Sequence, residues 1–252
     1  MKEGLFETIR SNGLYVLSFA LIVAAAFAVA FVFERAARKK DGESGPLFTT
    51  RSIALAGIFS AFAAVLHLLD FPMPFAPGFY KLDFSEVPVL VGSYALGPTA
   101  GVMIEFIKIL LKLVIKGTST AFIGDLANFV VGCSFILPAS IIYRFNRTRK
   151  SAFISCIAGT LTITVFGTVF NAVYLLPAFS AFYGMPMQTL IDMGTAINSG
   201  ITNVATFVVL AVAPLNLVKG AAVSLITMLL YKPLMKALRK MKLVPSQRSK
   251  TK

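Results

Sequence analysis

Long apolar runs separated by short basic segments recur along this chain of 252 residues, and they constrain its fold more than any other feature. The first run covers residues 14–33, which is roughly the 20 residues that a helix needs to cross a bilayer. The chain is 57% hydrophobic and 14% charged, whereas soluble domains average about 45–50% apolar and about 25% charged residues. The sequence therefore predicts an all-α membrane protein and disfavours a soluble, disordered or disulfide-rich fold.

The apolar runs predict about seven membrane spans, a six-span core preceded by one N-terminal helix. They lie, in chain order, at residues 14–33, 52–69, 87–96, 99–115, 121–143, 152–176 and 201–231. Gly97 and Pro98 form a tight turn between the third and fourth runs. Pro177 is expected to close the sixth run and Pro214 to break the seventh, because proline removes a helical hydrogen bond and clashes with the preceding turn.

The composition divides the chain into four parts. We expect an N-terminal transmembrane helix (residues 1–37), a cytoplasmic linker (38–50), the six-span core (51–240) and a basic cytoplasmic tail (241–252). The first run is too long for the apolar part of a signal peptide, so we interpret it as a retained helix. The linker sequence RKKDGESGPLFTT is polar and carries two glycines and a proline, as is typical of a loop.

Basic residues give the expected orientation. The formal net charge is +13, and most Lys and Arg residues fall in three clusters within residues 35–51, 144–150 and 232–252. Short flanks rich in Lys and Arg stay in the cytoplasm, and an even number of spans separates successive clusters. The pattern predicts a multi-pass protein of the cell membrane with its N-terminus outside and its C-terminus cytoplasmic, and it disfavours nucleic acid as a partner. The loops at residues 71–88, 116–120 and 177–200 would then cover a pocket that opens outward.

Ionisable residues at membrane depth are costly and need a partner or a role. Glu105 and Lys108 are spaced for an ion pair on one helix face, and Lys112 is expected to extend toward the outer interface. Asp83 and Glu86 stand where a helix begins, which favours capping of its N-terminus.

Polar side chains in the outer halves of several spans form the candidate binding site. The residues are Asp125, Asn128, Asn171, Asn216 and Lys219. Each one alone is typical of contacts between helices, but their common depth favours a ligand site equally. Asparagine offers a donor and an acceptor side by side, and lysine adds a point donor. The set suits an uncharged, hydrogen-bonding small molecule, such as one with an imide or amide edge.

Other motifs narrow the function. Cys133 and Cys156 lie inside apolar runs and are interpreted as buried residues, and a single histidine, His67, excludes multi-histidine metal sites. The chain has no phosphate-binding loop of the G-x-x-x-x-G-K-[ST] type, no H-E-x-x-H and no G-x-S-x-G. We therefore expect neither an enzyme nor a bound cofactor.

Small residues recur at helical spacing in the second run. Ala56, Ser60 and Ala64 form one stripe, and Gly57 and Ala61 form the next. Such stripes let membrane helices approach closely. The spacing by itself favours packing within the chain over docking of a partner.

Four segments resemble a known family. They are YKLDFSEVPVLVGSYALGPTAG (residues 80–101), STAFIGDLANFVVG (119–132), FNAVYLLP (170–177) and PLNLVKG (214–220). Together they resemble the riboflavin-specific substrate-binding subunits, or S components, of energy-coupling factor (ECF) transporters, the RibU family. The resemblance extends from about Arg51 to Leu238 and leaves the N-terminal helix outside it.

The resemblance implies a function and a set of residues. Members have six spans, bind riboflavin near the outer surface under capping loops, and dock onto a membrane scaffold (T) subunit that carries two cytoplasmic ATPases. The positions matching the flavin contacts are Asn171, Asn216 and Lys219, with Asn128, Leu82, Asp83 and Phe84 lining the pocket. Tyr174 and Asp125 are added because they lie close in sequence. The resemblance also shifts Ala56, Ser60 and Ala64 toward a role in docking.

Several alternatives stay open from the sequence. The same fold could bind another flavin, such as FMN, or another vitamin. The chain could also be an autonomous secondary carrier. The additional N-terminal helix could be an extra anchor or a docking element for a different partner.

Overall fold

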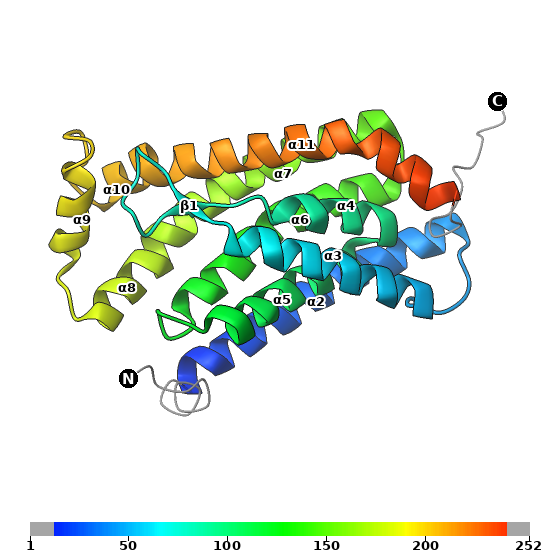
Figure 1. Cartoon of the computed structure of the whole chain (residues 1–252), viewed down its shortest axis with the longest axis horizontal. Helices are drawn as coiled ribbons and strands as arrows, with labels where there is room; N and C mark the ends of the chain where they lie inside the picture. Colours follow the sequence, from blue (N-terminus) through cyan, green and yellow to red (C-terminus); the bar gives the residue numbers. More distant parts are fainter. Residues whose placement is uncertain (1–12, 241–252) are drawn as a thin grey trace.

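The computed structural model describes residues 13–240, and its long helices run side by side along one axis (Figure 1). The predicted basic tail at residues 241–252 lies outside the described residues, as does the start of the N-terminal part. The long helices are α2 (Gly13–Asp41), α3 (Thr50–Leu68), α5 (Pro98–Lys116), α6 (Ile123–Phe145), α7 (Arg149–Phe170) and α11 (Ala213–Lys240).

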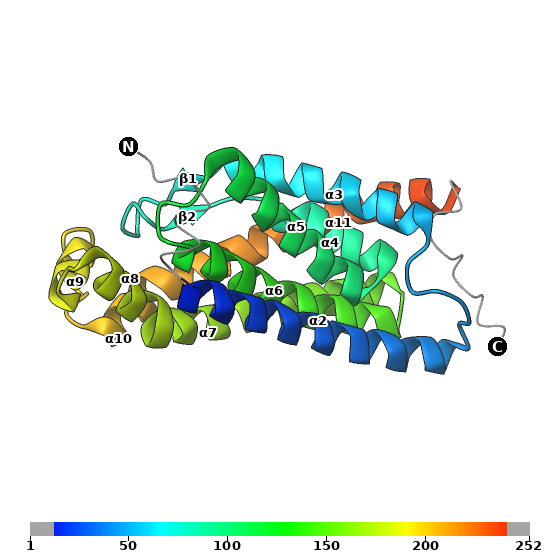
Figure 2. The ribbon, with the colours of Figure 1, turned by 90° about the horizontal axis from the view of Figure 1, so that it is seen from below.

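Shorter elements complete the fold. They are β1 (Phe71–Pro72), β2 (Lys81–Leu82), α4 (Glu86–Leu96), the π-helix η1 (Asn171–Leu175), α8 (Leu176–Tyr183), α9 (Met187–Thr195), α10 (Val204–Phe207) and the π-helix η2 (Val208–Val212). β1 and β2 pair as a short antiparallel hairpin. Both views place this hairpin, α8 and α9 at one end of the bundle, which we call the loop end (Figures 1 and 2). The α2–α3 connection and the C-terminal part of α11 lie at the other, the basic end.

Five segments of the described chain are long and apolar enough to cross a membrane. They are Val16–Asp41, Thr50–Leu68, Ile123–Phe145, Arg149–Tyr183 and Val204–Leu238. The expected seven spans thus include two helices that do not qualify by length and composition. α4 has only 11 residues, and α5 carries Glu105, Lys108 and Lys112. The protein is a multi-pass, all-α membrane protein.

α4 lies at the centre of the bundle, in contact with α3, α5, α6 and α11. It is buried from Glu86 to Ala95, as expected for a helix that is apolar on every side. The chain reverses after it at Gly97, whose φ of +107° favours glycine, and Pro98 starts α5 in the position that proline prefers.

The two prolines do not break their helices, so both predicted breaks were wrong. Each proline follows two residues after a π-helical turn, Pro177 after η1 and Pro214 after η2. The wider π turn changes the hydrogen-bond register just before the proline, which keeps the helix continuous across it. Helical backbone therefore extends over Arg149–Tyr183 and over Val204–Leu238.

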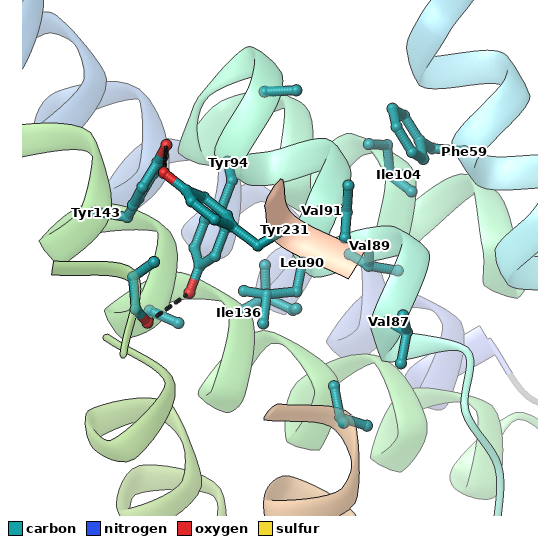
Figure 3. Close-up of a cluster of buried hydrophobic side chains, with 14 of the residues drawn as sticks. Phe59, Val87, Val89, Leu90, Val91, Tyr94, Ile104, Ile136, Tyr143 and Tyr231 are labelled. Atoms are coloured by element: carbon teal, nitrogen blue, oxygen red, sulfur yellow. Dashed lines mark hydrogen bonds between the residues drawn. The ribbon is translucent and has the colours of Figure 1, made fainter. Parts of the chain in front are cut away.

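The apolar core at the basic end contains three tyrosines from three helices (Figure 3). Tyr94 stacks on Tyr143 with ring centroids 4.2 Å apart, and the Tyr143 and Tyr231 hydroxyls are 2.9 Å apart. Tyr94 Oη also pairs with Ser155 Oγ at 2.5 Å. Buried hydroxyls that pair with one another lock α4, α6, α7 and α11 together.

The N-terminal helix α2 is packed onto α5 and α6. Arg144 of α6 binds three carboxylates, Glu34 (2.9 Å), Asp41 (2.7 Å) and Glu43 (2.8 Å). The Glu34 carboxylate fits against Gly97, where any Cβ atom would collide with it.

The small-residue stripe on α3 is not on the surface. Ala56, Ser60 and Ala64 are buried within this chain, because this face of α3 packs on α4 and α5. The exposed side of α3 carries the other stripe, Gly57 and Ala61. The expectation that the first stripe offers a docking surface is corrected accordingly.

Candidate functional site

A partly enclosed cavity of about 120 Å³ lies toward the loop end, and we call it the amide cavity. Four of the predicted residues meet there: Asn128 from α6, Asn171 from η1, and Asn216 and Lys219 from α11. The remaining lining residues are Phe79, Tyr80, Lys81, Gly124, Ala127, Val131, Leu175, Phe179, Val212 and Leu215. Residues that are distant in the sequence thus form one site with aromatic and amide surfaces.

A second cavity of about 410 Å³, the wide cavity, adjoins the first. The two share Phe79, Lys81, Gly124, Asn128 and Phe179. Asp125 lines the wide cavity and is paired there with Lys112 at 2.5 Å. The sequence analysis expected Lys112 to extend toward the outer interface. In the structure its ammonium is held by the Asp125 carboxylate.

Asn171 is fixed by two hydrogen bonds. Its Nδ2 donates to the Gly167 carbonyl at 2.7 Å, and its Oδ1 accepts from the Tyr80 hydroxyl at 2.8 Å. Burial raises the pKa of Tyr80, so this hydroxyl keeps its proton and acts as the donor. Together the contacts join the loop after β1 to the π turn of η1.

Asn216 differs because its donor is unused. The residue is 5% exposed, and its Nδ2 has no hydrogen-bond partner in the described part of the chain. A buried unpaired donor costs about 1–3 kcal/mol. Gly167 permits this placement, since a Cβ there would lie 2.5 Å from Asn216 Nδ2. The arrangement leaves a donor ready for an acceptor atom in the cavity.

Lys219 is held by two carboxylates that the sequence analysis assigned to helix capping. Its Nζ lies 3.1 Å from Asp83 Oδ2 and 3.1 Å from Glu86 Oε2. Burial acts to raise the pKa of Asp83, but Lys219 and His67 outweigh it and hold that pKa well below its usual range. Asp83 is therefore an ionised partner, and the ammonium has a fixed position.

Other predicted residues lie outside the two cavities. Leu82 and Asp83 are buried, and Phe84 packs on the core with its ring 6.0 Å from that of Phe71. Tyr174 stacks on Phe170 at 5.2 Å. The loop reaches the amide cavity through Phe79–Lys81 instead, because the β1–β2 hairpin turns residues 82–84 toward the bundle interior.

Sequence reasoning missed the ion pairs that join residues 83–86 to Lys219. His67, Lys81 and Phe179 line the cavities, and Glu86 holds Lys219. The available signal was the group of carboxylates around Asp83, because carboxylates that become buried need cationic partners from elsewhere in the chain. Within residues 13–240, no group of three or more His, Cys, Asp or Glu could hold a metal ion.

A multi-pass membrane protein with a small, partly enclosed cavity of apolar and amide side chains at one end has the features of a small-molecule binding subunit. Residues 51–231 match the family described as "ECF transporter, substrate-specific component", and the chain belongs to this family. This is a family of transport proteins and not of enzymes.

Relatives and a solved structure agree with this assignment. The chain is 31% identical to the riboflavin transporter FmnP of Bacillus subtilis (strain 168), over 72% of this chain and 90% of that protein. It is 33% identical to the riboflavin transporter RibU of Staphylococcus aureus (strain TCH60), over 73% and 89%. A structure described as "Structure and mechanism of the S component of a bacterial ECF transporter" aligns with a TM-score of 0.58 and 32% identity, over 74% of this chain and 96% of that one.

Proposed function

We propose that this chain captures riboflavin in the amide cavity and delivers it across the membrane with the help of ATP-hydrolysing partner subunits. The observation that carries the proposal is the unpaired, buried Asn216 Nδ2 in a cavity that Asn128, Asn171 and Lys219 also line. The flavin ring has an imide edge with two carbonyl oxygens flanking an N–H group. Asn216 and Lys219 supply donors for the carbonyl oxygens, and amide oxygens of the cavity accept from the N–H.

Roles follow for the other cavity residues and for the remaining predicted residues. Phe79 and Phe179 would cover the faces of the ring, since both line the two cavities. Asp125, with one oxygen unpaired among the described residues, would accept from a hydroxyl in the wide cavity. Residues 82–84 and Tyr174 would support the cavity from behind.

The proposed topology has a six-span core at residues 51–240, a linker at 38–50 and an additional span within residues 1–37. The N-terminus lies outside and the C-terminus in the cytoplasm. The basic clusters at residues 35–51 and 144–150 and the described basic residues at the end of α11 support this orientation, because they fall at the end of the bundle opposite the cavities and such clusters stay in the cytoplasm. The cavities would then open outward, where a nutrient is captured.

The proposed partners are a membrane scaffold subunit and two cytoplasmic ATPases. The family assignment supports them, since the family is described as the substrate-specific component of a transporter. Docking would use the exposed side of α3, where Gly57 has open space around it and where Ile58 and Phe62 are exposed.

Purification of the full chain in detergent, followed by a visible absorbance spectrum, tests the ligand. We expect a yellow flavin to co-purify or to bind on addition with quenching of its fluorescence. Titrations with FMN and with an unrelated vitamin separate the alternative ligands. Uptake into vesicles that contain this chain without ATPases, driven by an ion gradient, would instead favour a secondary carrier. Absence of any flavin binding would refute the proposal.

A further inference from the structure

We propose that Asp83 and Glu86 are positioning residues, which fix the Lys219 ammonium at the wall of the amide cavity so that it can bind a ligand carbonyl. The inference rests on the proposed function and deepens it. Neither carboxylate lines the amide cavity, whereas Lys219 does. Their effect on a ligand in the amide cavity therefore passes through the lysine, because His67, the other partner of Asp83 near a cavity, lines only the wide cavity.

The donor count of Lys219 supports this role. A lysine ammonium has three N–H donors and no acceptor. Two of them are directed to Asp83 Oδ2 and Glu86 Oε2, each 3.1 Å away. One donor is left, and two fixed partners restrict the direction in which it points. A flexible side chain is thereby converted into a single fixed donor.

The two carboxylates are themselves fixed by further contacts. Asp83 Oδ1 accepts from the Ser85 backbone N–H at 2.8 Å, and Asp83 Oδ2 lies 3.4 Å from His67 Nδ1. Glu86 Oε1 lies 3.3 Å from Lys108 Nζ, which in turn lies 2.6 Å from Glu105. These contacts form an ionic network that extends from His67 of α3 through Lys219 of α11 to Glu105 of α5.

The free-energy cost of burying these linked ion pairs indicates that the ionic network has a function. All its members are less than a tenth exposed, and burying charges is expensive even when they are paired, so that apolar residues of the same volume are often as stabilising. Of the residues in this ionic network, Lys219 alone lines the amide cavity. A rigid ammonium that is already desolvated loses little conformational freedom when a ligand binds.

Paired substitutions separate positioning from a purely structural brace. We compare Glu86→Gln, Asp83→Asn and Lys219→Met, and each carboxylate variant combined with Lys219→Met, by titrating riboflavin fluorescence against purified protein. Each single variant is expected to weaken binding by about tenfold or more. In the Lys219→Met background, Glu86→Gln and Asp83→Asn should have no further effect, because the group that they position is gone.

Glu105→Gln is the matched control. It removes a buried carboxylate from the same ionic network, but Glu105 contacts Lys108, and both Lys108 and Glu86 stand between it and Lys219. We expect less than threefold loss of affinity. The visible bands of bound flavin supply a second readout, because an ammonium at a ring carbonyl shifts them. Lys219→Met and Glu86→Gln should change these bands in the same way, whereas Glu105→Gln should leave them unchanged.

Two results would overturn the inference. One is wild-type affinity in both Glu86→Gln and Asp83→Asn, and the other is a full additional loss when either is combined with Lys219→Met. If a charge-removing variant does not fold, Glu86→Asp provides the test: it keeps the charge but shifts the ammonium, and unchanged affinity overturns the inference. Lack of flavin binding by the unsubstituted chain would refute the proposed function itself.

Discussion

Two charged clusters, one toward each end of the bundle, differ in where their unpaired polar groups lie. At the basic end, Nε, Nη1 and Nη2 of Arg144 each have a carboxylate partner at 2.7–2.9 Å. Glu34 Oε2 has no partner there among the described residues, but Glu34 lines neither cavity. Toward the loop end, Asn216 Nδ2 and Asp125 Oδ2 have no partner among the described residues. Polar groups that satisfy one another make a structure rigid, whereas unpaired groups beside a cavity are available to a ligand.

The surroundings of the two clusters differ in the same way. Arg144 joins α6 to α2 and to the linker, and the neighbouring tyrosines pair their hydroxyls with other side chains. The loop end instead contains both π turns, which are frequent at functional sites, and both cavities. The comparison teaches that substitutions at the basic end should change stability, and those at the loop end should change ligand affinity.

Arg144→Met should have the largest effect. It leaves Glu34 buried without its cationic partner, and loss of one member of a buried ion pair costs about 3–5 kcal/mol. Unfolding in detergent can be followed with a thiol-reactive dye, since Cys133 and Cys156 are free and buried. Arg147→Met is the control, because its pair with Glu43 is longer, at 3.5 Å, and more exposed. A large loss of flavin affinity in folded Arg144→Met protein would break the comparison.

Asn216→Ala tests the loop end. Riboflavin affinity should fall by about tenfold or more, which is about 1.4 kcal/mol, because the ligand loses a donor. Stability without ligand should be unchanged or higher, since the variant removes a buried donor that has no partner. Asn146→Ala, at the exposed end of α6, makes the same change at the basic end and should leave affinity unchanged. Equal affinity of Asn216→Ala and wild type would sink the site assignment.

Gly167→Ala should act on the same residue indirectly. The new Cβ would lie 2.5 Å from Asn216 Nδ2, so the amide must move, and we expect affinity to fall about three- to tenfold. Helix propensity favours alanine by about 1 kcal/mol, so stability should not fall in parallel. Gly57→Ala gives the same helical gain at a position with open space. If both variants bind riboflavin equally well, the position of Asn216 is not critical.

Removal of one tyrosine hydroxyl at each end gives the smallest effects and the sharpest contrast. Tyr80→Phe removes the donor to Asn171 and should weaken riboflavin binding by a few fold. Tyr94→Phe removes the contact with Ser155 and should cost about 1 kcal/mol of stability with unchanged affinity. Interchanged effects, with stability lost at Tyr80 and affinity lost at Tyr94, would contradict the functional division between the ends.

The sequence predicted the class of fold and part of the site. Asn128, Asn171, Asn216 and Lys219 were expected at a common depth, and the structure brings them to one cavity. Periodicity did not predict that Lys219 is held by Asp83 and Glu86, because partners this far apart in the chain, 136 residues for Asp83, leave no local pattern. It also failed at Pro177 and Pro214, since a π turn before a proline is a property of backbone register and not of residue type.

The amino-acid sequence by itself determined which parts of the chain lie in the membrane and which lie in water. Apolar runs must leave water, basic flanks must stay in it, and this balance is set by composition before any contact forms. The tertiary structure alone decided which face of each helix meets another, and so buried Ala56 and Ser60 while it left Gly57 exposed. It also decided which buried charges find partners and which donor stays unpaired, because those outcomes depend on distances between segments that are remote in the chain.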